Sequence, residues 1–400
     1  MDQKLEEKLF QTVEKNTEWA KSVRHELHQY PELDFELPKT IALISSYLDA
    51  IPGVVYRKAV GGSAIIADIE GKDKTKTIAL RADIDALPIL EASGCPFPSK
   101  HKGNMHACGH DVHATIVIAV LKNLSEHRED LPCNVRVLFQ PAEETTGGAL
   151  PLIKEGALEG VSYIYGLHVD VAKEVGQVGY EYGAMYASST DANFKITGKS
   201  GHGAYPSLAV DAVVVAASVV TALQSVVSRT TDARDALVLT FGTVNGGTKE
   251  NIIAQEVFLK GTMRSLTEEV KETAKKRITA LVEDIAAGFG AKGEVYLNDN
   301  YISLINHDEC VDIVKANAIH LLGAENVLEE KVPNMGVEDF AYYVKEIPGA
   351  FWHLGVRNEE LGIVESIHND KFNVDEDAIA IGVKMGILNI FQTYEKLLSK

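Results

Sequence analysis

Positive charge is scarce in this sequence. Its 39 lysine and arginine residues stand against 57 aspartate and glutamate residues, giving a formal net charge of −18 and an isoelectric point near 5.2. A protein that binds a nucleic-acid backbone or an anionic membrane surface needs a basic excess to displace counterions. We therefore expect no nucleic-acid partner and no membrane partner, and an anionic substrate would need a local positive centre.

Cysteine is also scarce, and long apolar runs are missing. The four cysteines, at positions 95, 108, 133 and 310, are dispersed without a CxxC pair, which fits a reducing compartment better than a disulfide framework. The opening residues, MDQKLEEKLF, are charged and lack the apolar core of a secretory signal. The longest uncharged apolar run, residues 212–223, is shorter than the ~18 residues that a membrane-spanning helix needs. These absences predict a cytoplasmic protein.

Helices and short strands follow one another in the N-terminal part of the chain. Apolar residues at helical spacing predict a long amphipathic helix over residues 3–30, which Pro31 ends. The other predicted elements are strands at 63–69, 77–83, 134–140 and 163–169, and helices near 38–49, 111–126 and 147–156. Strands flanked by helices predict an α/β domain with a sheet covered on both faces.

A different pattern begins near residue 185. The predicted order is strand 191–198, helix 208–227, strand 236–244, strand 252–263, helix 267–289 and strand 293–299, which is the β-α-β-β-α-β order of a ferredoxin-like α+β domain. The α/β pattern then resumes with a helix near 307–321, the strand AFWHLGV and a closing helix from Asp375. We therefore expect a discontinuous catalytic domain, residues 1–184 and 299–400, with residues 185–298 inserted into it.

The segment NMHACGHDVH, residues 104–113, concentrates three histidines and one cysteine in a chain that has only 13 His and 4 Cys. Cys108 and His110 flank a glycine, which tolerates tight backbone curvature, so both side chains could converge on one metal ion. A cysteine nucleophile is the alternative, but it needs a distant histidine and does not explain the local crowding. A helix-entry loop with solvated histidines is the third interpretation, and other segments must decide.

Three further segments carry suitable ligands. FQPAEE places Glu143 and Glu144 just after a predicted strand, at the edge where open α/β sheets hold their ligands. Adjacent carboxylates repel each other, so a nearby cation would favour the ionised forms. GLHV brings His168 to the end of another strand, and IHND brings His368 to a loop before the last helix. Taken singly, these residues are better explained as an exposed acidic turn and two ordinary core or surface histidines.

Together with these segments, several motifs occur in a fixed order: RHELHQYPEL, RADIDALPI, MHACGHDVH, QPAEE, GLHV, GKSGHGAYP, NIIAQEVFLKGTMR and GVEDFAYY. In this order they resemble the metal-dependent amidohydrolases that include hippurate hydrolase, N-acyl-amino-acid deacylases and plant auxin-conjugate hydrolases. These enzymes are relatives of two-metal exopeptidases such as aminoacylase and carnosinase. The resemblance covers essentially the full chain and implies a metallopeptidase-like catalytic domain with a central mixed sheet. One departure is Asp370, where relatives often carry proline, and it affects how His368 is presented.

The resemblance implies a role for each of these residues. It makes Glu143 the general base and Asp85 a carboxylate that orients a histidine ligand. His106 and His113 are expected to be supporting or solvated residues. The implied ligands of a two-metal centre are Cys108, His110, Glu144, His168 and His368. Thiolate, imidazole and carboxylate ligands admit zinc, manganese, nickel or cobalt, so the sequence does not select the metal.

For the inserted domain, the resemblance implies substrate contacts and self-association. His202, between two glycines, would stabilise the oxyanion, either in its own subunit or in the neighbouring subunit of a homodimer. Asn251 and Arg264 would grip the substrate, with Arg264 as the local positive centre that an acidic protein needs for an anionic substrate. An ordinary polar loop residue and a strand-end surface charge are the structural alternatives for His202 and Arg264.

These residues predict a two-metal amidohydrolase that cleaves an N-acyl-amino acid into a carboxylic acid and a free amino acid. A dipeptidase or aminopeptidase on the same scaffold is the nearest alternative, and it would need an acceptor for the ammonium group of its substrate. A metal-binding scaffold without catalytic activity is a further alternative. It would not need a general base, so the presence of Glu143 beside Glu144 argues against it. A cysteine hydrolase that uses Cys108 would keep its activity in the presence of a chelator.

Overall fold

The structure, a computed structural model, describes residues 1–399 as two compact units. Unit 1 comprises Met1–Gly183, Ile305–Lys331 and the chain from Tyr342 onward, and unit 2 comprises Ala184–Leu304 and Val332–Ala341. We had placed residues 299–304 and 332–341 in the catalytic domain. They belong to unit 2 because residues 299–301 continue a strand of its sheet, and because Asn334 exchanges backbone hydrogen bonds with Met185 and Ala187.

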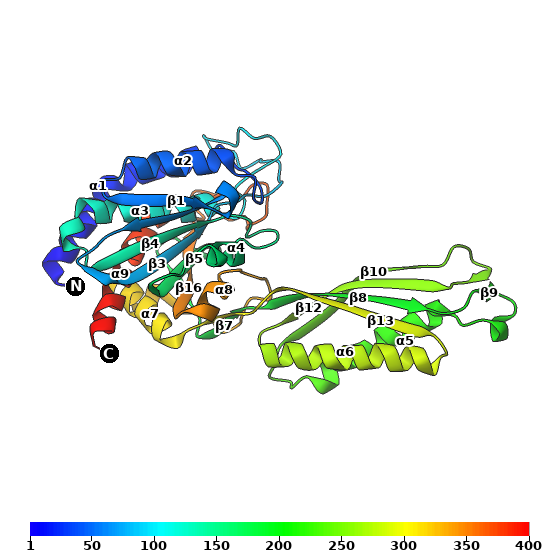
Figure 1. Ribbon diagram of the computed structural model, residues 1–400. Coiled ribbons are helices and arrows are strands. Elements are labelled where there is room, and N and C mark those ends of the chain that lie inside the picture. The colour runs from blue at the N-terminus through cyan, green and yellow to red at the C-terminus, as the bar shows by residue number, and fades with distance from the viewer. Residues whose placement is uncertain (400) are drawn as a thin grey trace. The chain divides into compact units, whose positions relative to one another are not determined.

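A mixed eight-stranded sheet, with the order β1-β2-β4-β3-β5-β16-β6-β15, forms the centre of unit 1 (Figure 1). β3 pairs in parallel with β4 and β5, and β5 pairs in parallel with β16, so these four strands end at the same edge of the sheet. The strands are β1 Val54–Ala59, β2 Ala64–Ile69, β3 Asp73–Asp83, β4 Cys133–Gln140, β5 Val161–Glu174, β6 Val178–Tyr180, β15 Val327–Glu329 and β16 Gly349–Arg357. The expected α/β fold class is confirmed.

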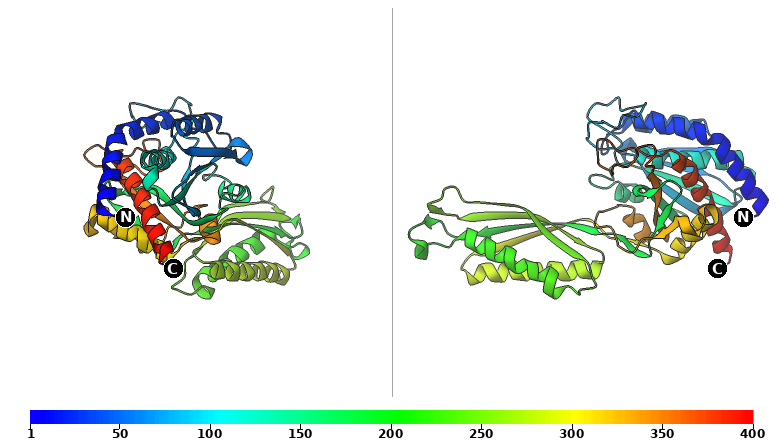
Figure 2. Two further views of the ribbon diagram at one scale, coloured as in Figure 1. Left: turned by 60° about the vertical axis from the view of Figure 1, so that its left-hand side comes forward. Right: turned by 180° about the vertical axis from the view of Figure 1, so that it is seen from behind.

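The helices of unit 1 pack on this sheet and on one another. α3, α7 and α9 contact its strands, and α1 lies against α3 and α9 (Figure 2). The helices are α1 Gln3–His28, α2 Pro38–Asp49, α3 His110–Glu126, α4 Ala149–Lys154, α7 Asp308–Leu322, α8 Ala341–Glu346 and α9 Asp377–Leu398. The helix predicted near 147–156 is only α4, because Gly147 and Gly156 have positive φ angles that end a helix on both sides.

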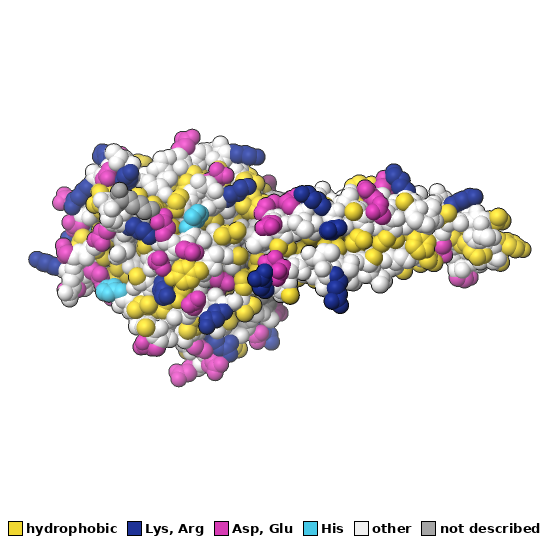
Figure 3. All heavy atoms as spheres, turned by 90° about the horizontal axis from the view of Figure 1, so that it is seen from below, with side chains coloured by type: hydrophobic (Ala, Val, Ile, Leu, Met, Phe, Trp, Pro, Cys, Tyr) yellow, Lys and Arg dark blue, Asp and Glu magenta, His cyan; other side chains and the backbone are white. Residues whose placement is uncertain are grey.

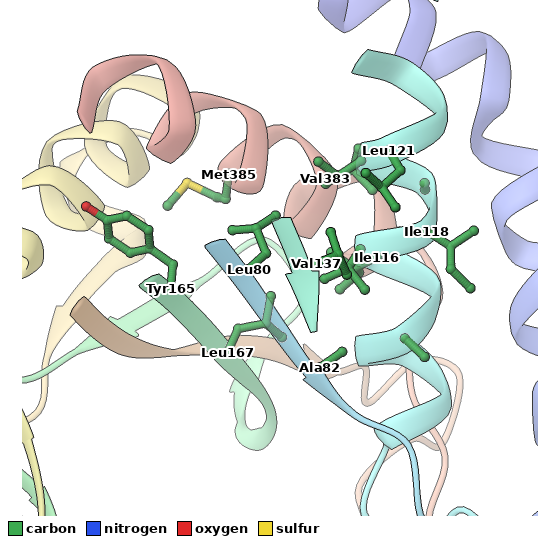
Figure 4. Packing of buried hydrophobic residues seen from close by; sticks show 14 of the residues in the cluster. Leu80, Ala82, Ile116, Ile118, Leu121, Val137, Tyr165, Leu167, Val383 and Met385 are labelled. Atoms are coloured by element: carbon green, nitrogen blue, oxygen red, sulfur yellow. The ribbon is translucent and has the colours of Figure 1, made fainter. Parts of the chain in front are cut away.

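Helix α3 is buried almost all round, and this explains its composition. Its central run, TIVIAVL, is rich in β-branched residues of modest helix propensity, and every residue in it is buried. Figure 4 shows Ile116 of α3 beside Val137 of the sheet, whereas Ile118 points from the opposite side of α3, away from the sheet. Tertiary packing, rather than propensity, therefore stabilises the helix that begins at the CGH motif.

Unit 2 has the predicted β-α-β-β-α-β order. Its antiparallel four-stranded sheet has the order β10-β12-β8-β13, and α5 and α6 contact its strands. The elements are β8 Ser188–Thr197, α5 Ala212–Ser225, β10 Leu237–Gly246, β12 Glu256–Ser265, α6 Glu268–Gly288 and β13 Lys292–Tyr301. The predicted strand 252–263 is two strands, β11 Ile252–Ile253 and β12, because β11 pairs with β9 Gly201–His202 instead of joining the sheet. The short strands β7 Gly183–Tyr186 and β14 Leu304–Asn306 pair where the chain passes between the units.

One helical segment is longer than the apolar run suggested. α5 continues into a π-helical turn, Val226–Thr230, and the segment Ala212–Thr230 is long and apolar enough to span a membrane by length and composition. We had considered only the apolar run that ends at residue 223. The residues just after it include uncharged polar side chains, which end an apolar run but add no charge, so the whole helical segment still qualifies by composition. One side of α5 packs into the core of unit 2, through Val215, Val219 and Leu223, and buried core helices pass the same test.

Replacing Ile116 by alanine tests the packing between α3 and α9. Ile116 is buried, and its Cδ1 lies only 2.5 Å from where a Cβ on Gly382 of α9 would stand. Ile116→Ala should destabilise unit 1 by about 2–5 kcal/mol through lost burial and a cavity. Val55→Ala, on the exposed side of β1, is the control and should change stability by no more than about 0.5 kcal/mol.

Urea titration followed by tryptophan fluorescence would measure both variants. The sequence contains 2 tryptophans, and Trp19 and Trp352 both lie in unit 1, so the signal reports the unfolding of that unit. Equal midpoints for Ile116→Ala and Val55→Ala would contradict this account of the core.

Candidate metal centre

The predicted metal ligands lie at the ends of neighbouring strands of unit 1. Glu143 and Glu144 follow β4, and His168 lies in β5. Cys108 and His110 stand at the start of α3, and His368 lies in the loop between β16 and α9. Because β3, β4 and β5 are parallel, their carboxyl ends meet at one edge, which is where ligands of α/β sheets bind.

Gly109 explains how Cys108 and His110 reach this edge. Its φ is +88°, and a Cβ at this position would lie 2.4 Å from Cγ2 of Val169 in β5. Glycine alone permits both the left-handed conformation and this close approach of the backbone to the strand. As a result, Sγ of Cys108 lies 3.2 Å from Nε2 of His168.

The side chains form overlapping groups that could each hold an ion. Their ligand atoms lie within 4.8 Å of one another in three groups: Cys108, His110 and His168; Cys108, Glu144 and His368; and His110, Glu143 and Glu144. Nε2 of His368 lies 3.2 Å from Oε1 of Glu144. All five predicted ligands and the predicted base therefore come together, and Cys108 belongs to two of the groups.

Hydrogen bonds fix the ring nitrogens of two of these histidines. Nδ1–H of His168 donates to the carbonyl oxygen of Val169 at 2.7 Å, and Nδ1–H of His110 donates to that of Asp85 at 2.9 Å. With the proton on Nδ1, the Nε2 lone pair of each ring points into the cluster, which is the tautomer that a metal ligand needs.

The electrostatics of the cluster favour a cation. Burial disfavours charge on His110, yet Asp83, Asp85 and Glu144 raise its pKa to about 10. Burial, together with Glu144 and Glu143, raises the pKa of the Cys108 thiol well above its ordinary value. Among the described residues, the buried atoms Nε2 of His110 and Oε1 of Glu144 have no hydrogen-bond partner. A divalent ion fits this donor set because it would satisfy both atoms and stabilise the thiolate.

Asp85 links two of the ligands. Its Oδ1 lies 3.3 Å from Nδ1 of His110, and its Oδ2 accepts a hydrogen bond from the backbone N–H of Glu144 at 3.1 Å. The resemblance implies that Asp85 orients a histidine ligand. Its contacts are those of a positioning residue, because it orients an imidazole and a carboxylate rather than facing the reacting atoms.

Asp83 is a site residue that the sequence reasoning missed. Its Oδ1 accepts from Nδ1–H of His113 at 2.6 Å, and its Oδ2 lies 2.7 Å from Nη1 of Arg81 and 3.7 Å from Nε2 of His110. The alternation in RADID places Asp83 and Asp85 together at the end of β3, and that spacing was the available signal. Nε2 of His113 accepts from the N–H of Val169 at 3.0 Å, so both nitrogens of this ring are engaged.

His106 and His113 are both buried, which excludes the solvated alternative for them. Neither ring nitrogen of His106 has a hydrogen-bond partner within residues 1–399. Burial lowers the pKa of His106 to about 3, so this ring is neutral.

His368 is presented by an unusual backbone. Its φ is +61°, and Ala142, just before Glu143, has φ +58°, so both segments that supply carboxylate and imidazole ligands are strained. The N–H of His368 donates to the carbonyl oxygen of Ala107 at 2.8 Å. Asp370, where relatives often carry proline, accepts from the N–H of Ala92 through its carbonyl oxygen at 2.7 Å. This loop therefore brings His368 to Glu144 without a proline.

In unit 2, the structure brings together two of the three predicted substrate residues. β9 pairs with β11 so that His202 stands opposite Ile252, and the N–H of Gly203 donates to the carbonyl oxygen of Asn251 at 2.9 Å. His202 is exposed, and its Nδ1 accepts from the N–H of Ala204 at 3.1 Å, which leaves the proton of the neutral ring on Nε2.

Arg264 lies separately, on β12, where it faces Val238 of β10 and Ser189 of β8 across the sheet. Burial lowers the pKa of its guanidinium, and in the described part of the chain its buried Nη1 has no hydrogen-bond partner. An unpaired buried guanidinium nitrogen is suited to bind an anion.

Comparison with known proteins agrees with this site. The chain is 38% identical over 366 residues to an N-acetyldiaminopimelate deacetylase of Halalkalibacterium halodurans, covering 90% of this chain and 96% of the relative. It is 34% identical over 382 residues to the thermostable carboxypeptidase 1 of Saccharolobus solfataricus, covering 94% and 96%.

A solved structure shares the fold. The crystal structure of a dinuclear metal-binding peptidase from the M20 family of Bacillus subtilis is 30% identical, with a TM-score of 0.84 and coverage of 96% of this chain and 99% of that one. The model of peptidase family M20/M25/M40 matches residues 79–388. The predicted resemblance is thus confirmed, and the chain belongs to peptidase family M20/M25/M40.

Proposed function

We propose that this chain is a two-metal amidohydrolase that cleaves the amide bond of N-acyl-amino acids, releasing a carboxylic acid and a free amino acid. The observation that carries the proposal is the cluster of Cys108, His110, Glu144, His168 and His368 with Glu143 beside it. The deacetylase among the relatives, by its name, acts on an N-acetyl amino acid, which supports this substrate class.

In this proposal, the five clustered residues hold two divalent ions, whose identity among zinc, manganese, nickel and cobalt the ligands leave open. Such ions, when bound, acidify a water molecule and polarise the scissile carbonyl. Glu143 removes the proton of the attacking water and delivers it to the nitrogen of the leaving amine. Asp85 keeps His110 in its ligand tautomer throughout.

Unit 2 supplies the substrate contacts in this proposal. Nε2–H of His202 donates to the oxyanion that develops on the attacked carbonyl, a role favoured by the Nδ1 contact to Ala204. Arg264 binds the carboxylate of the amino-acid part, which would pair the Nη1 atom that lacks a partner among residues 1–399. Asn251, held beside His202 by the β9–β11 pair, adds an amide to the substrate contacts.

We further propose a homodimer built through unit 2, in the cytoplasm. β10 is an edge strand of its sheet, and edge strands pair readily with a second copy. Figure 3 shows hydrophobic side chains running along one face of this unit, and the exposed apolar residues of its outer surface include Leu208, Val213 and Val214. All four cysteines are buried free thiols, which supports a reducing compartment.

A peptidase on the same scaffold is the second candidate, and the carboxypeptidase among the relatives favours it. An aminopeptidase or dipeptidase must bind the ammonium group of its substrate, whereas a deacylase needs room for an acyl group.

Assays of the metal-loaded protein should separate these candidates. We expect N-acyl-amino acids to be hydrolysed with a higher kcat/KM than dipeptides with a free amine, and methyl esters of the same N-acyl-amino acids to be poorer because Arg264 loses its anion. A chelator should abolish the activity. Preference for free dipeptides would favour the peptidase, and full activity in the chelator would point to a cysteine hydrolase that uses Cys108.

Glu143→Gln should keep the metal content of the wild type but lower kcat by at least about 100-fold, because general-base catalysis is typically worth 10²–10⁴-fold. Glu144→Ala is the matched comparison and should lose metal and activity together. Steady-state kinetics and metal analysis of both variants provide the test. The assignment of the base is wrong if Glu143→Gln retains nearly full kcat.

A mixing experiment tests whether His202 serves the neighbouring subunit. If it acts across a dimer, an inactive Glu143→Ala protein and an inactive His202→Ala protein should regain activity when subunits exchange, since a mixed dimer has one site with both groups intact. Light scattering at several concentrations would report the oligomeric state. A strict monomer with full activity would exclude the dimer, and a fully active His202→Ala protein would exclude the oxyanion role.

A further inference from the structure

His368 is the predicted ligand with the least local support. Its backbone is in the left-handed region, a conformation that persists in a non-glycine residue only where the surroundings hold it. Half of its side chain is exposed, and it lies between β16 and α9 in a loop without helix or strand. Around His368, backbone hydrogen bonds tie this loop to residues far away in the sequence: the N–H of His368 donates to Ala107, and that of Ala92 donates to Asp370.

Both of those partners lie in another irregular segment, residues 84–109, between β3 and α3. Apart from isolated bridges such as that between Leu87 and Met105, this segment has neither helix nor strand, so side-chain contacts contribute to keeping the stretch between these two residues in one conformation. The position of His368 therefore depends on what holds residue 92 in place.

Glu91, the residue before Ala92, is the main anchor of this part of the segment. Its Oε2 accepts from the N–H of Ser99 at 2.6 Å. Its Oε1 accepts from Nε2–H of His28 at 3.2 Å, from Sγ–H of Cys95 at 3.3 Å and from the hydroxyl of Ser93. The carboxylate thus folds residues 91–99 around itself and fastens them to the end of α1.

His28 connects this anchor to the start of α3. Its Nδ1–H donates to Oδ2 of Asp111 at 2.8 Å, and Asp111 directly follows the predicted ligand His110. Nε–H of Arg24, one turn earlier in α1, donates to the same oxygen at 3.0 Å. Arg24 and His28 of the motif RHELH therefore hydrogen-bond to the start of α3, and His28 also bonds to the segment 84–109; both of these parts of the chain carry predicted ligands.

His28, Glu91 and Cys95 lie close enough together to be considered as a third metal site. The hydrogen bonds speak against that interpretation. Both ring nitrogens of His28 face carboxylates, and Oε1 and Oε2 of Glu91 already accept from four donors. The polar atoms of His28 and Glu91 therefore already have hydrogen-bond partners without a metal ion. We call the group of His28, Glu91 and Cys95 the clamp.

We propose that Glu91 is a positioning residue of the metal centre: it holds the Ala92–Asp370 hydrogen bond in place and thereby keeps His368 within reach of Glu144. Of the three ligand groups, only that of Cys108, Glu144 and His368 contains His368, so only this group depends on Glu91 of the clamp in this way. The group of Cys108, His110 and His168 is positioned by the start of α3 and by β5. This inference rests on the proposed two-metal function.

The expected effect is selective loss of one ion. Removing a residue that orients a metal ligand typically lowers metal affinity about 10- to 100-fold. Glu91→Ala should therefore weaken the binding of one ion by about that factor and leave the other unchanged. Dialysis against a weak chelator, followed by elemental analysis for zinc, should find two ions in the wild type and about one in Glu91→Ala.

Four further variants sharpen the comparison. His368→Ala should also retain about one ion, and the double variant should retain the same one, because Glu91 acts through His368. Glu126→Ala is the matched control: this carboxylate also joins α1 to α3, through Nδ2 of Asn16 at 3.1 Å, but it lies at the other end of α3. It should retain both ions. If Glu91→Ala folds poorly, Glu91→Gln replaces it in the test. This variant keeps the shape of the side chain but not its charge, and it should show a smaller loss of the same ion.

The outcomes separate this inference from the proposed function. Wild-type affinity for both ions in Glu91→Ala, loss of both ions, or a further loss in the double variant would each overturn the positioning role while the two-metal site stands. If the wild-type protein itself holds fewer than two ions, the proposed function fails and this inference fails with it.

Discussion

Buried negative charge at the ends of β3 and β4 is the constraint on which the rest of unit 1 depends. Asp83, Asp85 and Glu143 are buried within a small volume, and Glu144 is only slightly exposed. Carboxylates in such surroundings must be paired with positive charge or with several hydrogen bonds, because desolvation otherwise drives them to the protonated form. Arg81 neutralises Asp83, and the histidines and a bound cation account for the others.

Around this charge, strands and a helix position some of the candidate ligands, and irregular segments position the others. The strands fix His168 and the two aspartates, and α3 fixes His110, so these atoms move little relative to one another. The carboxylates after β4 and the imidazole of His368 come from irregular segments, where Ala142 and His368 both have positive φ angles. The loop that carries His368 also receives hydrogen bonds from a distant residue: Arg24 of α1, which is buried, donates to Asn373 and Glu376 near the end of this loop.

Much of the fold, and the clustering of the candidate ligands, could be predicted from the sequence for identifiable reasons. The apolar runs of β3 and β4 are buried and continuous, and the β-α-β-β-α-β pattern is regular. Asp83 and Glu91 were not predicted because their contacts are with residues far away in the sequence. Asp83 accepts a hydrogen bond from His113, and Glu91 accepts one from His28. The assignment of residues 332–341 also failed, since a few backbone hydrogen bonds to residues 185–187 decide it and leave no periodic signal.

The discontinuity of unit 1 has a consequence for biosynthesis. On the ribosome, residues 184–304 emerge as one stretch that contains all strands of the four-stranded sheet and the two helices packed on it, α5 and α6. This part can therefore fold while synthesis continues. Unit 1 cannot complete its core until α9, near the end of the chain, has been translated and packs against α3 and α1. During that interval the unfinished sheet exposes apolar surface, the kind of surface that makes folding intermediates prone to aggregate.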